Sequence, residues 1–583
     1  PLISIAELNT SVLSFAKIAN NTLEFGDIDL YSLFFHIKTY KGETDTNLDI
    51  FVDKFDSQNQ STNTNTFLLS STNLKIINSQ FFLTNQNLET PHVLDFNNLN
   101  ILATDFLISG ADVKAKIQAL SFKESRGPSL KNIQTNFSYT PTQMRFSDLQ
   151  IKSLASSIYG ALQFDYQRED LSSFSDKVKI SGFFENTSID LEELNSFYDE
   201  FGKNQIAKLN TVFSGTLDDL LFQEFHLETN SNTSMQGKLH FKQLFKTNSD
   251  HFELDGEFKA FSSSYGELTA LLPRVLGTRI PSGFSTLGRF NMKGGVKLTN
   301  KIIDLEMDID TQIGALFIDL NLNEIEAIDS VSYTGEIRFT DFDLGAAIGE
   351  PTIGLVSSNL SVVGSGFTKE NVKSNINGIF VSFVFQDYNY ADLEVSGIVK
   401  DKIFNGQLDV SDTNLKLNFK GLVDFSDTEN IYDFSALIEH ANLNALNLVS
   451  RDQVSILKGE MAMDMKGTSI DDVYGVLSFK DATYKNQNGD YEFKDFEITS
   501  TFDKAATRTI QVNSPEIVNG SLRGKFRMNE LPNLMRNSLG DIYTKFNPFE
   551  IVENQFLNFN LKIHNKIAEL LHPKLKIGPN TSV

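Results

Sequence analysis

The sequence predicts a mainly β, elongated and repetitive fold with short interspersed helices. Short runs of alternating apolar and polar residues recur along the chain, bounded by the Asn, Asp, Ser, Gly and Pro that turns favour. A motif of an acidic or amide residue followed by Leu recurs at intervals of 76 to 99 residues, which is typical of repeat architectures. The chain has 50 Phe, 15 Tyr and no Trp, and Phe suits an apolar face because it carries no polar atom.

The alternation is clearest in residues 393–449. After the turn at 411–414, odd positions from Leu415 to Phe425 are mostly apolar, and most even positions are charged or amide. Because successive side chains of a strand point to opposite faces, this stretch predicts a sheet with one apolar and one wet face.

The N-terminal part predicts further short strands. Alternation also resumes at Leu48, Ile50 and Val52, before a polar loop at 57–66. Asn488-Gly489 predicts a hairpin turn, whereas Asn405-Gly406 interrupts a strand pattern and is interpreted as a bulge. The expected strands are 67–77, 81–85, 94–108, 114–122, 133–139, 144–151 and 157–166.

Short helices are expected where Leu residues recur at helical spacing between the strands. Asp190 and Glu193 have the spacing of a capping box for one of them. The expected helix residues, at the edge of the sheet, are Leu191, Leu194, Leu268, Leu271, Leu344, Ile348, Leu443, Leu446, Leu531 and Leu534.

Composition excludes several function classes. The net charge of −24 argues against a nucleic-acid partner, which would need a basic surface. The chain has no Cys, and its eight His form no zinc motif. No nucleotide loop or nucleophile elbow is present, and the paired acids Asp218-Asp219 and Asp471-Asp472 stand at turns. We therefore expect no enzyme, no catalytic residue, no metal and no cofactor.

No stretch approaches the roughly 18 apolar residues of a membrane-spanning helix. The chain begins at Pro1 without a signal-peptide pattern, so we expect a portion of a longer protein whose membrane anchor lies outside it. The expected regions are 1–160, a first set of β-repeats; 161–290, β-repeats with short helices; 291–545, groove repeats; and 546–583, a lead-in to a missing or truncated C-terminal domain. Clustered Gly and Pro mark a candidate seam at 276–295.

Three segments carry a resemblance to a known family. Residues 334–345, 397–446 and 271–288 resemble TamB-like members of the AsmA superfamily. The resemblance implies a protein of the Gram-negative periplasm, anchored in the inner membrane by an N-terminal helix outside this chain. It implies a long, curled antiparallel β-sheet, a β-taco, whose hydrophobic groove carries phospholipids toward the outer membrane. It also implies contact with an outer-membrane barrel of the BamA family (TamA-like), through a region outside or at the end of this chain.

The residue pattern is compatible with such a groove. Each acyl methylene moved from water to an apolar floor gains roughly 0.8 kcal/mol, so no specific polar site is needed. Bound phospholipid or detergent is the only non-protein component we expect. The residues expected to line one wall are Val395, Val399, Phe404, Leu408, Val410, Leu415, Leu417, Phe419, Val423, Phe425, Phe434 and Ile438.

Three other functions remain open. The chain could assist outer-membrane protein assembly with a BamA-family barrel, which the resemblance also allows. An outer-membrane β-barrel is disfavoured by the absence of Trp and the paucity of Tyr for aromatic girdles. A β-solenoid scaffold is disfavoured because solenoid repeats are shorter and tighter.

Overall fold

The structure is a computed structural model. It describes residues 2–12, 17, 22–56, 67–87, 92–124, 130–195, 200–244, 251–277, 280, 282–325, 331–367, 371–426, 428–540, 547–564 and 578. Strand accounts for 67% of it and helix for 9%, and the strands form one long, curled, open sheet of 31 strands. The predicted mainly β, curled antiparallel sheet with short helices is therefore confirmed.

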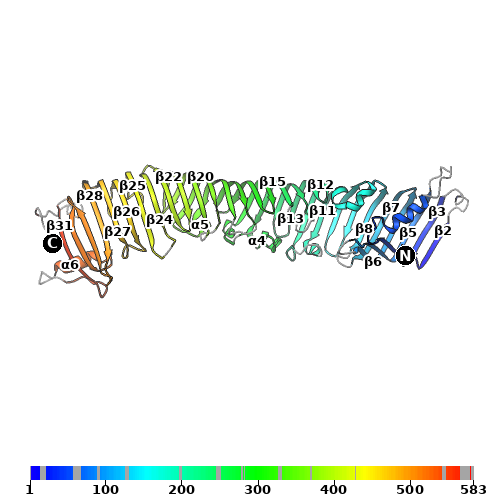
Figure 1. The fold of residues 1–583 in the computed structure, drawn as a ribbon, viewed down its shortest axis with the longest axis horizontal. Coiled ribbons are helices and arrows are strands. Elements are labelled where there is room, and N and C mark those ends of the chain that lie inside the picture. Colours follow the sequence, from blue (N-terminus) through cyan, green and yellow to red (C-terminus); the bar gives the residue numbers. More distant parts are fainter. Residues whose placement is uncertain are drawn as a thin grey trace. The chain divides into compact units, whose positions relative to one another are not determined.

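The chain divides into two compact units, Pro1–Gln312 and Ile313–Val583, and the candidate seam at 276–295 lies inside the first. Figure 1 shows the strands of each unit following one another in chain order. Most strands pair antiparallel with the next one along the chain, as β21 does with β22. At the N-terminal end this order changes, because β1 pairs with β4, and β3 and β4 both pair parallel with β5.

The strands of unit 1 are β1 (Ile3–Ser4), β2 (Glu7–Val12), β3 (Thr22–Tyr31), β4 (Phe34–Thr39), β5 (Leu68–Asn85), β6 (His92–Ser109), β7 (Asp112–Glu124), β8 (Leu130–Thr140), β9 (Gln143–Lys152), β10 (Ser157–Asp165), β11 (Lys179–Asp190), β12 (Ile206–Thr216), β13 (Asp219–Thr229), β14 (Ser234–Lys242), β15 (Glu253–Ser264), β16 (Arg289–Thr299) and β17 (Ile302–Thr311). Its helices are α1 (Asn47–Asp56), η2 (Arg168–Ser173), α2 (Phe174–Lys177), α3 (Leu191–Leu194), α4 (Tyr265–Leu271) and η3 (Ser282–Leu287).

The strands of unit 2 are β18 (Gly314–Asn323), β19 (Ser332–Asp343), β20 (Ile353–Ser365), β21 (Lys373–Phe385), β22 (Tyr388–Lys400), β23 (Ile403–Ser411), β24 (Leu415–Asp424), β25 (Asn430–Asn442), β26 (Ser455–Gly467), β27 (Tyr474–Asn486), β28 (Gly489–Phe502), β29 (Arg508–Ser514), β30 (Val518–Lys525) and β31 (Phe556–Ile563). Its helices are α5 (Leu344–Ile348) and α6 (Leu531–Gly540).

β-Bulges interrupt many of the strands. Asn186 in β11 (φ 49°) and Asp341 in β19 (φ 44°) adopt the left-handed conformation where the register with the next strand shifts. Asn and Asp tolerate this conformation better than other non-glycine residues, and bulges bend a strand and increase its twist. Buried hydroxyls take up backbone groups beside the bulges. Thr187 Oγ1 accepts from the Tyr159 N–H at 3.1 Å, and Thr211 Oγ1 donates to the Glu224 carbonyl at 2.7 Å.

A bulge corrects one predicted strand boundary. The sequence placed a break between 67–77 and 81–85, but β5 runs through both as one strand, with Asn78 in the left-handed conformation. Asn405-Gly406 lies in the regular interior of β23 and marks no bulge. The hairpin predicted at Asn488-Gly489 is confirmed and joins β27 to β28.

The strand expected around Leu48, Ile50 and Val52 is wrong, because residues 47–56 form α1. Thr46 and Asp49 explain the difference. The Thr46 N–H donates to Asp49 Oδ2 at 2.9 Å, and the Asp49 N–H donates to Thr46 Oγ1 at 3.1 Å. This reciprocal capping box starts a helix. The predicted loop at 57–66 lies outside the described residues.

Four of the five expected short helices are present, namely α3, α4, α5 and α6. The fifth position, around Leu443 and Leu446, is a run of turns instead. Its helix-like bond from the Leu446 N–H to the Asn442 carbonyl is 3.0 Å long. Asn447 then adopts φ 61°, a left-handed conformation that ends a helix after one turn.

Candidate functional site: an apolar face in unit 2

Eleven of the twelve predicted wall residues lie within β22, β23, β24 and β25 of unit 2. The register makes them neighbours on one face, because Val410 pairs with Leu417 and Leu417 pairs with Ile438. Phe425 is the exception. It follows β24, is 48% exposed, and its ring centroid lies 5.9 Å from that of Tyr432.

The wall continues beyond the predicted stretch as rows of cross-strand neighbours. We define the first row as Val395, Leu408, Phe419, Ala436, Met461, Phe479 and Phe496. The second row is Gly397, Gly406, Gly421, Phe434, Met463, Leu477, Ile498 and Val512. Each row crosses the strands without a polar side chain. The continuation into β26 was not predicted, although Met461, Met463 and Met465 recur at strand spacing among Glu460, Ala462, Asp464 and Lys466.

Aromatic rings and glycines alternate where the two rows meet. The Phe419 ring centroid lies 6.2 Å from that of Phe404 and 5.0 Å from that of Phe434. At Gly421 (φ 149°) an added Cβ would lie 2.4 Å from both the Asp433 carbonyl oxygen and the Phe434 Cα, so a larger residue there would push the backbone of β25 away. The glycine therefore allows β24 and β25 to approach closely beside these rings.

One end of this wall is covered by the chain itself. Leu446, 1% exposed, packs in a cluster with the buried Val410 and Ile438, and half-buried Leu415 and Leu417 lie against that cluster. Leu443 belongs to the same contact. This part of the wall is closed. Leu408 also lies against that cluster, so the open part consists of the half-buried Val399, Phe404, Phe419, Val423 and Phe434.

The apolar side chains of the short helices differ in how deeply they are buried. In α6, Leu534 (5% exposed) packs with Ile510, Leu522 and Leu561, and Leu531 lies against them. Leu191 of α3 is buried, whereas Leu194, Leu268, Leu271 and Leu344 are half-buried and Ile348 is 38% exposed. The predicted capping box of α3 is wrong in part. Asp190 accepts from the Glu192 N–H, but Glu193 accepts from the Ser153 and Ser156 hydroxyls of a neighbouring loop.

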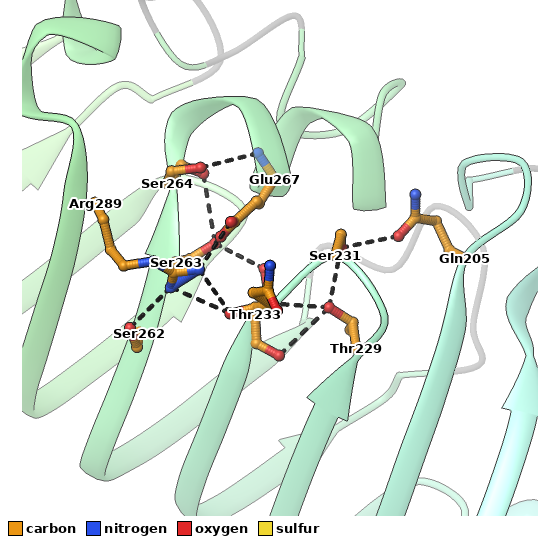
Figure 2. A network of polar contacts seen from close by, with 10 residues as sticks. Gln205, Thr229, Ser231, Thr233, Ser262, Ser263, Ser264, Glu267 and Arg289 are labelled. Atoms are coloured by element: carbon orange, nitrogen blue, oxygen red, sulfur yellow. Dashed lines mark hydrogen bonds and ion pairs between the residues drawn. The ribbon is translucent and has the colours of Figure 1, made fainter.

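Polar contacts fix α4 to the sheet (Figure 2). Arg289 donates to Glu267 at 2.8 Å, and Ser264 caps the helix by accepting from the Glu267 N–H. The fully buried hydroxyls of Thr233 and Ser263 lie 2.8 Å apart. Buried polar groups need such partners, so we assign this network the structural role of holding α4 against the sheet. The Leu side chains of α4 remain half-buried.

A buried carboxylate anchors the segment that carries Leu446. Asp452 is 4% exposed and accepts from the Arg451 guanidinium at 2.8 Å and from the Tyr484 hydroxyl at 2.6 Å. The Arg451 hydrogen bond, with help from Tyr484 and Gln487, lowers the pKa of Asp452 from 3.8 to about 2. Asn444 Nδ2 adds a bond to the Asp452 carbonyl at 3.0 Å.

We expect Asp452→Asn to lower the free energy of unfolding at pH 7 by about 2 kcal/mol, since a buried hydrogen-bonded charge is lost. A native pKa below the unfolded value gives stability that is present above about pH 4 and is lost as the pH falls toward 2. The wild type should therefore lose more stability than the variant between those pH values. Urea unfolding across this range measures both, with exposed Asp464→Asn as the control. Parallel pH profiles for wild type and D452N would contradict the assignment.

Each unit has a cavity on its sheet. One, of about 630 Å³, is in unit 1 between β11 and β15 and includes Phe183, Val212 and Glu224. The other, of about 300 Å³, is in unit 2 and includes Asn418, Ser435 and Leu437. In unit 2 these residues alternate with the wall residues Phe419, Phe434 and Ile438, so the cavity opens away from the apolar face.

Within the described ranges, no group of His, Asp and Glu is arranged to hold a metal ion. Nor does any described helix have the length and hydropathy needed to cross a membrane. Comparisons with protein-family models, with curated proteins and with solved structures found no match to this chain.

Proposed function

We propose that the open apolar face of unit 2 binds the acyl chains of phospholipids and carries them along the sheet. One observation supports this proposal most directly. The first and second rows cross β22–β28 without a polar side chain, and all their members except the buried Val395 and Ala436 stay half-buried in the absence of a second sheet over the described strands. A contiguous apolar surface of this kind marks a binding surface in a folded protein.

The opposite face carries most of the charged and amide side chains, with Ile398, Leu437 and Val476 exposed among them. Lys416, Asn418 and Lys420 of β24 are exposed on it, as are Glu460 and Asp464 of β26. The polar face keeps the sheet hydrated, while acyl chains gain roughly 0.8 kcal/mol per buried methylene on the other. Neighbouring strands offer nearly the same contacts, so a chain can shift by one strand with little change in free energy.

The resemblance to TamB-like proteins extends the proposal to a cellular role. It places the chain in the periplasm, between an inner-membrane anchor and a BamA-family barrel in the outer membrane, within outer-membrane biogenesis. Assistance to outer-membrane protein assembly is the alternative role from the same resemblance, and the continuous apolar rows favour lipid.

Phospholipid that co-purifies with the protein is the test. We expect extraction and mass spectrometry of detergent-free protein to yield phospholipid, at one or more molecules per chain. A soluble β-rich protein of similar mass, purified from the same cells, controls for carry-over. Protein that is free of phospholipid and takes up none from vesicles would refute the proposal.

A further inference from the structure

Three methionines occupy alternate positions on the apolar face of β26. Met461 lies in the first row between Ala436 and Phe479, and Met463 lies in the second row between Phe434 and Leu477. Both are half-buried, whereas Met465 is only 5% exposed. These are three of nine methionines in the chain, so a third of its thioethers stand side by side on the proposed lipid surface.

We propose that Met461 and Met463 form a peroxide-reactive site whose oxidation disables this stretch of the apolar face. A thioether sulfur attacks one oxygen of hydrogen peroxide, the O–O bond breaks, and a sulfoxide and water form. The sulfur is oxidised by two electrons and the peroxide is reduced. Susceptibility follows exposure, so Met461 and Met463 react before Met465. The effect on lipid rests on the proposed function, whereas the order of reaction does not.

The two sulfurs lie among apolar side chains, so a sulfoxide oxygen there would find no hydrogen-bond partner among its cross-strand neighbours. The cross-strand neighbours on this face are Ala436 and Phe479 for Met461, and Phe434 and Leu477 for Met463. None of these side chains has a polar atom that could accept or donate a hydrogen bond. A sulfoxide there must keep its oxygen hydrated, and an acyl chain laid over it would strip that water. Oxidation thus converts a continuous apolar row into an interrupted one.

The experiment treats the intact chain with hydrogen peroxide and follows each methionine by mass spectrometry. We expect Met461 and Met463 to form sulfoxide before Met465, which is the internal control on the same strand. Uptake of a fluorescent phosphatidylethanolamine from phosphatidylcholine vesicles should then fall about tenfold. In a double variant, Met461→Leu with Met463→Leu, uptake after the treatment should equal the uptake of the same variant before it, because Leu has no sulfur to oxidise.

The order of oxidation tests the reactive site, and the uptake measurements test its effect on lipid binding. Oxidation of Met465 as fast as Met461 and Met463 would overturn the site itself. Equal loss of uptake in wild type and in the double Leu variant would overturn its role, since the damage would then lie elsewhere. Retained uptake by fully oxidised wild type would overturn it as well. If untreated protein takes up no phospholipid, the proposed function fails, and the order of oxidation still tests the reactive site.

Discussion

Replacement of Phe419 by Asp is expected to reduce bound phospholipid by about tenfold, because a carboxylate in an apolar row must either stay hydrated or lose its water at a large cost. Phe419 stands in the middle of the first row, between Leu408 and Ala436. Mass spectrometry of lipid extracted from purified protein measures the effect. Phe404→Asp, on the neighbouring strand, should act in the same way, because the Phe404 ring centroid lies 6.2 Å from that of Phe419.

Ser435→Asp is the matched control for this prediction. Ser435 is exposed on the opposite face and pairs with Lys420, so a carboxylate there meets water and a cation. Bound phospholipid should stay at the wild-type level. Circular dichroism then shows that each variant keeps its strands. Phe419→Asp protein that folds and carries as much phospholipid as wild type would exclude this face as the lipid site.

Leu446→Ala is expected to lower the free energy of unfolding by about 3 kcal/mol, the usual cost of a cavity at a fully buried Leu. Leu446 is 1% exposed and packs in one cluster with Val410 and Ile438, so the substitution leaves a cavity among close-packed side chains. Urea unfolding measures the change. The same substitution should also uncover part of the closed wall.

Leu448→Ala is the control for that experiment, because Leu448 belongs to the same run of turns and is 53% exposed. Its loss should change the free energy of unfolding by less than about 0.5 kcal/mol. Equal effects of L446A and L448A would show that Leu446 does not hold the turns against the sheet.

The sequence allowed the strands and one face of the sheet to be predicted, because period-two alternation is a local property. Leu415, Leu417 and Phe419 are two residues apart, and any strand places them together. The position of Leu446 over Val410 and Ile438 was not predictable in this way. It depends on a turn that brings a later segment back over the same strands, and no local pattern records that contact.

Bulges also limited how well the strand boundaries could be predicted from the sequence. Asn78 and Asn186 are residues that turns favour, so they suggest the end of a strand when they actually bend it. The reciprocal bonds of Thr46 and Asp49 likewise decide between helix and strand at α1. Apolar spacing alone fits both there, since Leu48 and Val52 are separated by four residues.

The pairing of each strand with its two neighbours has a mechanical consequence. In a single layer, the loss of one strand removes hydrogen bonds from only the two beside it, whereas a strand in a two-layer core also supports the opposite sheet. Within unit 2, a destabilising substitution in β24 should therefore loosen β23 and β25 first. Its effect on the other strands should decrease with their distance from β24 along the sheet. Such a sheet tolerates local damage and unfolds in segments, in the manner of repeat proteins.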